Sequence, residues 1–305
     1  MTGNMNEKSS LLTPEQTGPR RPRIALMGEF SAGKSTLANL MVGTDPLPEQ
    51  VVATQLPPVW ISHGEGPSSL FDVHGREELC DLQNLQEIDK DDTAYIRIYS
   101  PADILLHCDL IDMPGISDPN TASVVWERLL PFADGVIWCT PATQAWRQSE
   151  AATWDGIDAK IREHSMLVIT RSDMLLAERD RKKVQQRIRK ETSELFAAHV
   201  MMSLHLARDA EIDSPQWQES GVDSFVETFL ELVAKIRKDL PDCDGSEPVL
   251  PAPTEAVDAT AISQSGSEKN VIVPRRPVAR RRLLKDVPKT EQPAPEALAY
   301  MPKFS

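Results

Sequence analysis

Long hydrophobic runs are missing from this 305-residue sequence, and aromatic residues make up only 5% of it. A membrane-spanning helix needs about 18 consecutive apolar residues. The best candidate, residues 124–140, is interrupted by Glu127, Arg128 and Asp134. The N-terminus also lacks the basic start and apolar core of a secretory signal peptide. The sequence therefore predicts a soluble, cytoplasmic protein.

Cysteine is equally scarce. The four cysteines form no C-x-x-C pair, and the six histidines show no spacing typical of metal ligands. We therefore expect reduced thiols and no metal site built from His and Cys. The net charge of −13 argues against a general nucleic-acid binder, although a local basic patch can still act on its own.

The composition changes twice along the chain, and 24 prolines indicate that part of it does not fold. Residues 1–20 are mostly polar, which predicts a disordered leader, and residues 241–305 are rich in proline and lose all periodicity. Residues 21–240 are predicted to form one domain. Within the tail, residues 275–285 carry a dense cluster of arginine and lysine.

One stretch, GEFSAGKS at residues 28–35, fits the phosphate-binding pattern G-x-x-x-x-G-K-[ST]. A buried strand is predicted before it and a helix after it. Backbone N–H groups and the helix N-terminus then form a cradle for anions. Lys34 is expected to reach the β- and γ-phosphates of a nucleotide, and Ser35 to ligate Mg²⁺. The residues expected to contact the nucleotide here are Gly28, Glu29, Phe30, Ser31, Ala32, Gly33, Lys34, Ser35 and Thr36.

The remaining pattern alternates between strands and helices, which predicts a mainly parallel sheet covered on both faces. The strands expected are 24–27, an edge strand near 62 entered through a proline-interrupted loop, 68–73, a half-buried 95–99, 104–113, 135–139, 166–170 and 200–206. The helices expected are 35–41, a short one within 76–92, 122–132, 149–163 with Ser149 as a possible cap, 178–199 and 222–240. Right-handed crossovers then place the ligand at the carboxyl ends of the strands.

Three further segments narrow the choice of nucleotide. Asp112 ends a buried strand, where it can hold Mg²⁺ through water while the N–H of Gly115 senses the γ-phosphate. The alternative is an ordinary strand-to-turn sequence.

Asp173, in the sequence TRSD at 170–173, can accept hydrogen bonds from both the N1–H and the 2-amino group of guanine, a pair of donors that adenine does not offer. The stem of Arg171 can lie along the base, after Thr170. Thr54 can complete the Mg²⁺ shell, or it is simply a turn residue.

With these motifs in order, residues 21–240 resemble the GTPase domain of bacterial dynamin-like proteins, within the TRAFAC class of P-loop GTPases. The P-loop variant FSAGKS, LIDMPG, TRSD and the segment AWRQSE at 145–150 carry the resemblance. It implies a Ras-like sheet with extra strands, Mg²⁺-dependent GTP hydrolysis and activation when two GTPase domains form a homodimer across their nucleotides. It also implies that Ser31 helps to stabilise transition-state charge, with K⁺ or Na⁺ as a further cofactor. Ile116 stands where Ras-type enzymes have a water-orienting glutamine, and Ser203 is the candidate for the last guanine motif.

The sequence departs from that family after residue 240, where no long stalk helices are predicted. Two functions stay open: a GTP-hydrolysing switch, and an adaptor that binds GTP with little hydrolysis. A stalk-bearing or membrane protein is a candidate partner. The basic tail segment is either a solvated linker or a reversible contact with anionic membrane at its inner face, and nucleic acid is the weaker alternative.

Overall fold

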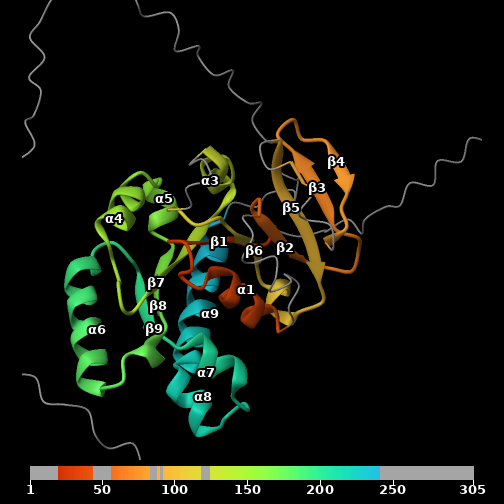
Figure 1. Cartoon of the computed structure of the whole chain (residues 1–305). Helices are drawn as coiled ribbons and strands as arrows, with labels where there is room; N and C mark the ends of the chain where they lie inside the picture. The colour runs from red at the N-terminus through yellow and green to blue at the C-terminus, as the bar shows by residue number, and fades with distance from the viewer. Residues whose placement is uncertain (1–19, 44–55, 83–87, 90–91, 118–123, 241–305) are drawn as a thin grey trace, which may run out of the picture. The chain divides into compact units, whose positions relative to one another are not determined.

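The computed structural model describes residues 20–43, 56–82, 88–89, 92–117 and 124–240, which form a nine-stranded sheet between two layers of helices (Figure 1). The strands are β1 (Arg23–Gly28), β2 (Val59–His63), β3 (Ser69–Asp72), β4 (Glu77–Leu79), β5 (Thr93–Ser100), β6 (Asp109–Asp112), β7 (Gly135–Pro141), β8 (Ser165–Thr170) and β9 (Ala198–Met201). The helices are α1 (Lys34–Val42), α3 (Val124–Leu129), α4 (Gln148–Asp155), α5 (Ala159–Arg162), α6 (Glu178–Thr192), α7 (Leu204–Asp209), α8 (Pro215–Ser220) and α9 (Val222–Asp239). Short 3₁₀ turns span η2 (Asp103–Leu106), η3 (Leu130–Phe132) and η4 (Ser172–Met174).

The strand order is β4-β3-β5-β2-β6-β1-β7-β8-β9. Strands β6, β1, β7, β8 and β9 are all parallel, β2 is antiparallel to β6, and β3 and β4 add an antiparallel hairpin beyond β5. The predicted α/β fold with a mainly parallel, Ras-like sheet and extra strands is confirmed.

Both faces of the central strands are buried, as parallel strands between helices require. Side chains alternate between the two cores because successive residues of a strand point to opposite faces. Ile24 and Leu26 of β1 pack in the core under α1, α7 and α9, whereas Ala25 and Met27 pack in the core under α3, α4, α5 and α6. Continuous apolar runs such as residues 24–27 therefore identify the strands correctly.

Several local predictions were wrong where distant packing decides the structure. Strand β2 is not an edge strand but lies between β5 and β6, because the hairpin β3–β4 occupies that edge. Residues 77–79, expected in a helix, form β4, while 83–87 and 90–91 lie outside the described residues. Strand β5 is almost fully buried rather than half-buried: Arg97 is only 6% exposed and lies over the ring of Trp60, 4.9 Å from its centroid.

The ends of several other helices and strands differ from the predicted ones. The strand expected over 104–113 begins only at Asp109, after η2. The helix expected over 149–163 is divided into α4 and α5 at Gly156, and its N-cap is Arg147, not Ser149. Helix α6 ends at Thr192, and only the first part of 200–206 is strand, because the Ser203 hydroxyl accepts from Leu206 N–H and begins α7. Helix α8 was not predicted.

This topology gathers the sequence motifs at one edge. The parallel strands β1, β6, β7, β8 and β9 all end at the same edge of the sheet, as parallel pairing requires. The P-loop, the Asp112–Gly115 turn and the TRSD sequence follow β1, β6 and β8. The segment after β7 and the residues after β9 complete this edge.

Candidate functional site

The P-loop begins at Gly28, where the end of β1 lies close against β7. Gly28 has φ of 137°, and a Cβ built on it would lie 2.1 Å from the carbonyl oxygen of Cys139. Only glycine fits that approach. The loop then turns through Ser31, whose φ is 57°, before α1 begins at Lys34. The predicted order of strand, turn and helix N-terminus is therefore present, with the loop amides at the start of α1.

Lys34 carries the positive charge of this loop. Its side chain is buried, and Nζ donates to the carbonyl oxygens of Gly28 at 3.3 Å and Glu29 at 2.9 Å. An ammonium held by the loop's own carbonyls is placed to exchange those partners for phosphate oxygens, which accept hydrogen bonds more strongly because they are charged.

Asp112 has the properties of a ligand for a hard cation. Its side chain is buried at the end of β6, and among the described residues Oδ1 has no hydrogen-bond partner. Burial raises the pKa of the carboxyl to about 6, although Lys34 and a hydrogen bond with Ser35 lower it. An unpaired carboxylate oxygen beside a serine hydroxyl suits Mg²⁺, which prefers oxygen ligands. Ser35 and Asp112 therefore fit the cation; Thr54 lies outside the described residues.

The turn after Asp112 packs directly on the P-loop. A Cβ added to Gly115 would lie 2.8 Å from Phe30 N and Cα, so no side chain fits between them. The N–H of Ile116 donates to Gly28 O at 3.2 Å, and the N–H of Phe30 donates to Ser117 Oγ at 3.2 Å. Movement of either segment therefore moves the other.

The TRSD sequence also contacts the P-loop. Thr170 Oγ1 donates to Ala32 O at 2.8 Å, and Arg171 Nη2 donates to Ser31 O at 2.6 Å. Arg171 itself adopts a left-handed backbone with φ of 58°. Thr170 at the end of β8 and Arg171 just after it thus hold two carbonyls of the P-loop, so the TRSD sequence and the P-loop are fixed relative to each other.

Asp173 and Ser203, expected to contact guanine from different parts of the chain, lie together. Ser203 Oγ donates to Asp173 Oδ1 at 2.6 Å and accepts from Leu206 N–H at 3.2 Å. Ser203 is fully buried after β9. The serine therefore orients the carboxylate, a relation that residue order alone does not reveal. The roles of both residues toward a base stay predictions.

The segment after β7 is built around Glu150, which the sequence did not single out. The carboxylate is fully buried and accepts from Trp138 Nε1 at 2.8 Å, Thr140 Oγ1 at 3.1 Å and Arg147 N–H at 2.8 Å. Burial raises its pKa, although these three donors lower it. Trp146 and Trp154 pack around Trp138 in edge-to-face contacts. The signal in the sequence was a glutamate three residues into a helix, after a tryptophan-containing strand.

We expect Glu150→Ala to lower the free energy of unfolding by about 3 kcal/mol, because it leaves three buried donors without an acceptor. Urea unfolding followed by tryptophan fluorescence measures this loss. Glu231→Ala, on the exposed side of α9, is the matched control and should leave the midpoint unchanged. Equal midpoints for the two variants would contradict the structural role given to Glu150.

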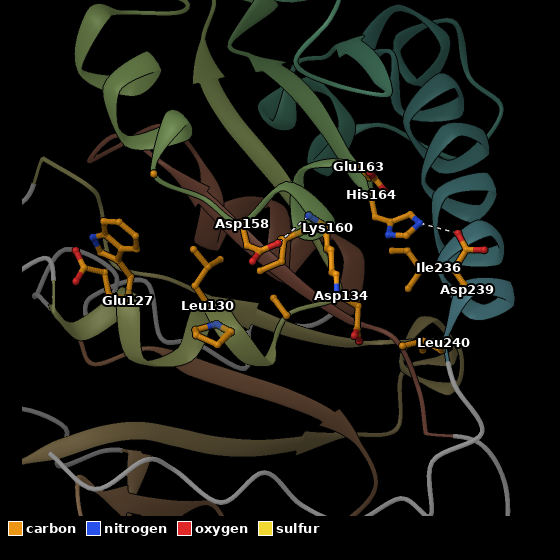
Figure 2. A pocket seen from close by; sticks show the side chains of 15 residues that line it. Glu127, Leu130, Asp134, Asp158, Lys160, Glu163, His164, Ile236, Asp239 and Leu240 are labelled. Atoms are coloured by element: carbon orange, nitrogen blue, oxygen red, sulfur yellow. Dashed lines mark hydrogen bonds and ion pairs between the residues drawn. The ribbon is translucent and has the colours of Figure 1, made fainter. Parts of the chain in front are cut away.

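A separate hollow of about 730 Å³ lies away from these motifs (Figure 2). It is lined by residues of α3, η3, α5 and the end of α9, and by Asp134 and His164, which immediately precede β7 and β8. These are the amino ends of the strands, opposite to the edge that carries the P-loop. His164 Nε2 and Asp239 Oδ2, which both line it, form a hydrogen bond of 2.9 Å. The hollow is not part of the candidate nucleotide site.

Among the described residues, Cys80, Cys108 and Cys139 are free thiols, and no group of three or more His, Cys, Asp or Glu side chains is placed to hold a metal. In the same part of the chain, no helix has both the length and the apolar character needed to cross a membrane.

Comparison with known proteins relates part of the chain to the dynamin family. The model of the dynamin family matches residues 24–172. Dynamin-like protein 2 of Campylobacter jejuni is 27% identical over 164 residues, and the isoniazid-induced protein IniC of Mycobacterium tuberculosis is 32% identical over 123 residues. These alignments cover 51% and 37% of this chain but only 26% and 25% of the relatives. The chain therefore spans about a quarter of the length of these relatives.

Solved structures support the same fold. Two chains described as an oligomerised bacterial dynamin pair, which senses and tethers membranes, superpose with TM-scores of 0.52 and 0.55 at 20% and 16% identity. Each match covers 72% of this chain, and 37% and 48% of the respective chains.

Proposed function

We propose that this chain is a GTPase domain of the dynamin family, whose model matches residues 24–172, and that it binds Mg²⁺·GTP and hydrolyses it to GDP as a switch. The observation that carries the proposal is the unpaired Asp112 Oδ1, buried beside Ser35 at the end of the P-loop. A buried carboxylate oxygen without a partner is costly unless a cation completes it.

In this proposal the chain supplies positioning and electrostatics. Lys34 and the loop amides hold the phosphates, and Ser35 and Asp112 hold Mg²⁺, which neutralises phosphate charge when bound. Asp173, oriented by Ser203, accepts from the guanine edge. Thr54 and the Gly115 N–H respond to the γ-phosphate, so hydrolysis releases both segments and changes affinity for a partner.

We further infer that hydrolysis needs help from outside one domain. Ile116 offers no hydrogen-bonding group where an attacking water would be oriented. Ser31, with a bound K⁺ or Na⁺, and a second copy of the domain are the proposed sources of the missing stabilisation. A domain by itself should therefore turn over slowly.

The test is turnover measured across protein concentration, in K⁺ and in Na⁺. If pairing completes the site, the rate per molecule should rise about 100-fold from the monomeric to the dimeric limit, the typical effect of completing a charge-stabilising site. A rate that is flat and negligible at every concentration supports the alternative, an adaptor that uses GTP structurally. Light scattering on the same samples reports whether pairing occurs.

Attachment to membranes is a further proposal. The solved dynamin pair senses and tethers membranes, and the basic segment 275–285 of this chain, outside the described residues, suits anionic lipid. Such contacts weaken as salt is raised. Co-sedimentation with anionic liposomes at low and high salt, with and without residues 270–305, separates a membrane contact from a solvated linker. A stalk-bearing or membrane protein partner stays a candidate.

A further inference from the structure

The carboxylate of Glu29, the second residue of the P-loop, joins two segments that are far apart in the sequence. Only 6% of the surface of Glu29 is exposed. Ser149 Oγ, at the start of α4, donates to Glu29 Oε1 at 2.6 Å. On either side of Glu29 in the chain, the backbone N–H of Phe30 donates to Ser117 Oγ at 3.2 Å and the carbonyl of Gly28 accepts from Ile116 N–H at 3.2 Å. Glu29 is therefore bonded through its side chain to the start of α4, while the residues on both sides of it in the chain are bonded to the turn after Gly115.

This carboxylate is held in its charged form. Burial raises the pKa of Glu29, but the bonds from Ser117 and Ser149 and the charges of Arg147 and Lys34 lower it further, so the pKa lies below its usual value. An ionised carboxylate only accepts hydrogen bonds, and bonds to a charge are stronger than neutral ones. Both serines thus stabilise the same charge, so loss of one changes the strength of the interaction with the other.

Ser117 is held against the P-loop. Its oxygen accepts from Phe30 N–H at 3.2 Å, and Ser117 also helps to lower the pKa of the Glu29 carboxyl. Ser117 follows Gly115 by two residues, and Gly115 packs on Phe30 without space for a side chain. A shift of Gly115 therefore cannot leave the bonds of Ser117 intact.

We propose that Glu29 is a positioning residue that couples the turn 115–117 to the exposed segment 147–149 at the start of α4. This inference rests on the proposed function, in which Gly115 responds to the γ-phosphate. When the turn moves, the charge of Glu29 loses Ser117, and Ser149 and Arg147 become its remaining partners outside the P-loop. The state of the nucleotide thereby reaches side chains at the surface, where Arg147, Gln148 and Ser149 are exposed.

Hydrogen exchange of the full chain tests this coupling. In the wild type, amides of residues 147–151 should exchange at different rates with Mg²⁺·GDP and with a non-hydrolysable GTP analogue. In Ser149→Ala that difference should disappear. Exchange there should also become about tenfold faster, the loss expected for one charge-assisted bond, while affinity for either nucleotide stays within about twofold because Ser149 does not line the cradle. Ser149→Thr, which keeps the hydroxyl, should restore the difference.

Two further variants locate the coupling. Ser117→Ala should abolish the same difference, although Ser117 does not touch α4, whereas Gln148→Ala, the matched exposed neighbour, should keep it. A nucleotide-dependent difference that persists in Ser149→Ala or Ser117→Ala overturns the inference, as does its absence from the wild type. A wild-type protein that binds neither nucleotide overturns the proposed function instead.

Discussion

The Lys34→Ala variant is expected to lose GTP binding by about 100-fold or more. A hydrogen bond to a charged group contributes about 1.5–3 kcal/mol, and the ammonium is placed to bond two phosphates. Lys34 is buried, and its Nζ donates to two carbonyl oxygens of the loop, so its charge lies within the phosphate cradle. Its loss also removes the nearest positive charge from the buried Asp112.

Binding of a fluorescent GTP analogue, measured by titration with excess Mg²⁺, gives the affinity directly. Circular dichroism and urea unfolding establish that the variant folds, because removal of a buried charge also affects stability. Lys182→Ala is the control: Lys182 is an exposed residue of α6 paired with Glu178, and it should bind like the wild type. A folded Lys34→Ala protein with unchanged affinity is incompatible with nucleotide binding at the P-loop.

The second large effect is expected at Asp173. Asparagine keeps one acceptor oxygen but places a donor where the carboxylate had its second acceptor. It therefore opposes one of the two guanine donors, and sites that read a substrate through buried hydrogen bonds discriminate strongly against a mismatch. We expect Asp173→Asn to weaken GTP binding by about 100-fold. Xanthosine triphosphate, which carries an oxygen in place of the 2-amino group, should bind the variant better than GTP does.

Competition by GTP, xanthosine triphosphate and ATP against one labelled nucleotide measures this change in nucleotide preference. Asp180→Asn, on the exposed side of α6, is the matched control and should retain the wild-type order. An Asp173→Asn variant that still prefers GTP to the same degree would refute the guanine contact, while leaving the phosphate site unaffected.

The sequence was sufficient for the parts of the fold that local patterns decide. Continuous apolar stretches such as 24–27 and 166–170 identify strands buried on both faces, and the turns that follow them place Lys34, Asp112 and Asp173 at one edge. The P-loop geometry also follows locally, because its glycines and the first turn of α1 are adjacent in the chain.

What the sequence did not reveal depends on partners distant along the chain. Strand β2 looked like an edge strand because nothing local indicates that β5 will cover it. The strand over 95–99 was expected to be half-buried, but Arg97 is buried against the rings of Trp60 and Phe71. Glu150 and Ser149 acquire their roles only when β7 and the P-loop lie beside α4, which residue spacing cannot indicate.

The central claim, that this edge of the sheet binds Mg²⁺·GTP, is tested most directly by calorimetric titration of the full chain with GTP and ATP, each with Mg²⁺ and with EDTA. We predict binding of GTP at one site per chain, weakened when EDTA removes the cation, and no comparable binding of ATP. Equal binding of ATP, or GTP binding that is indifferent to EDTA, would contradict the roles given to Asp173 and Asp112.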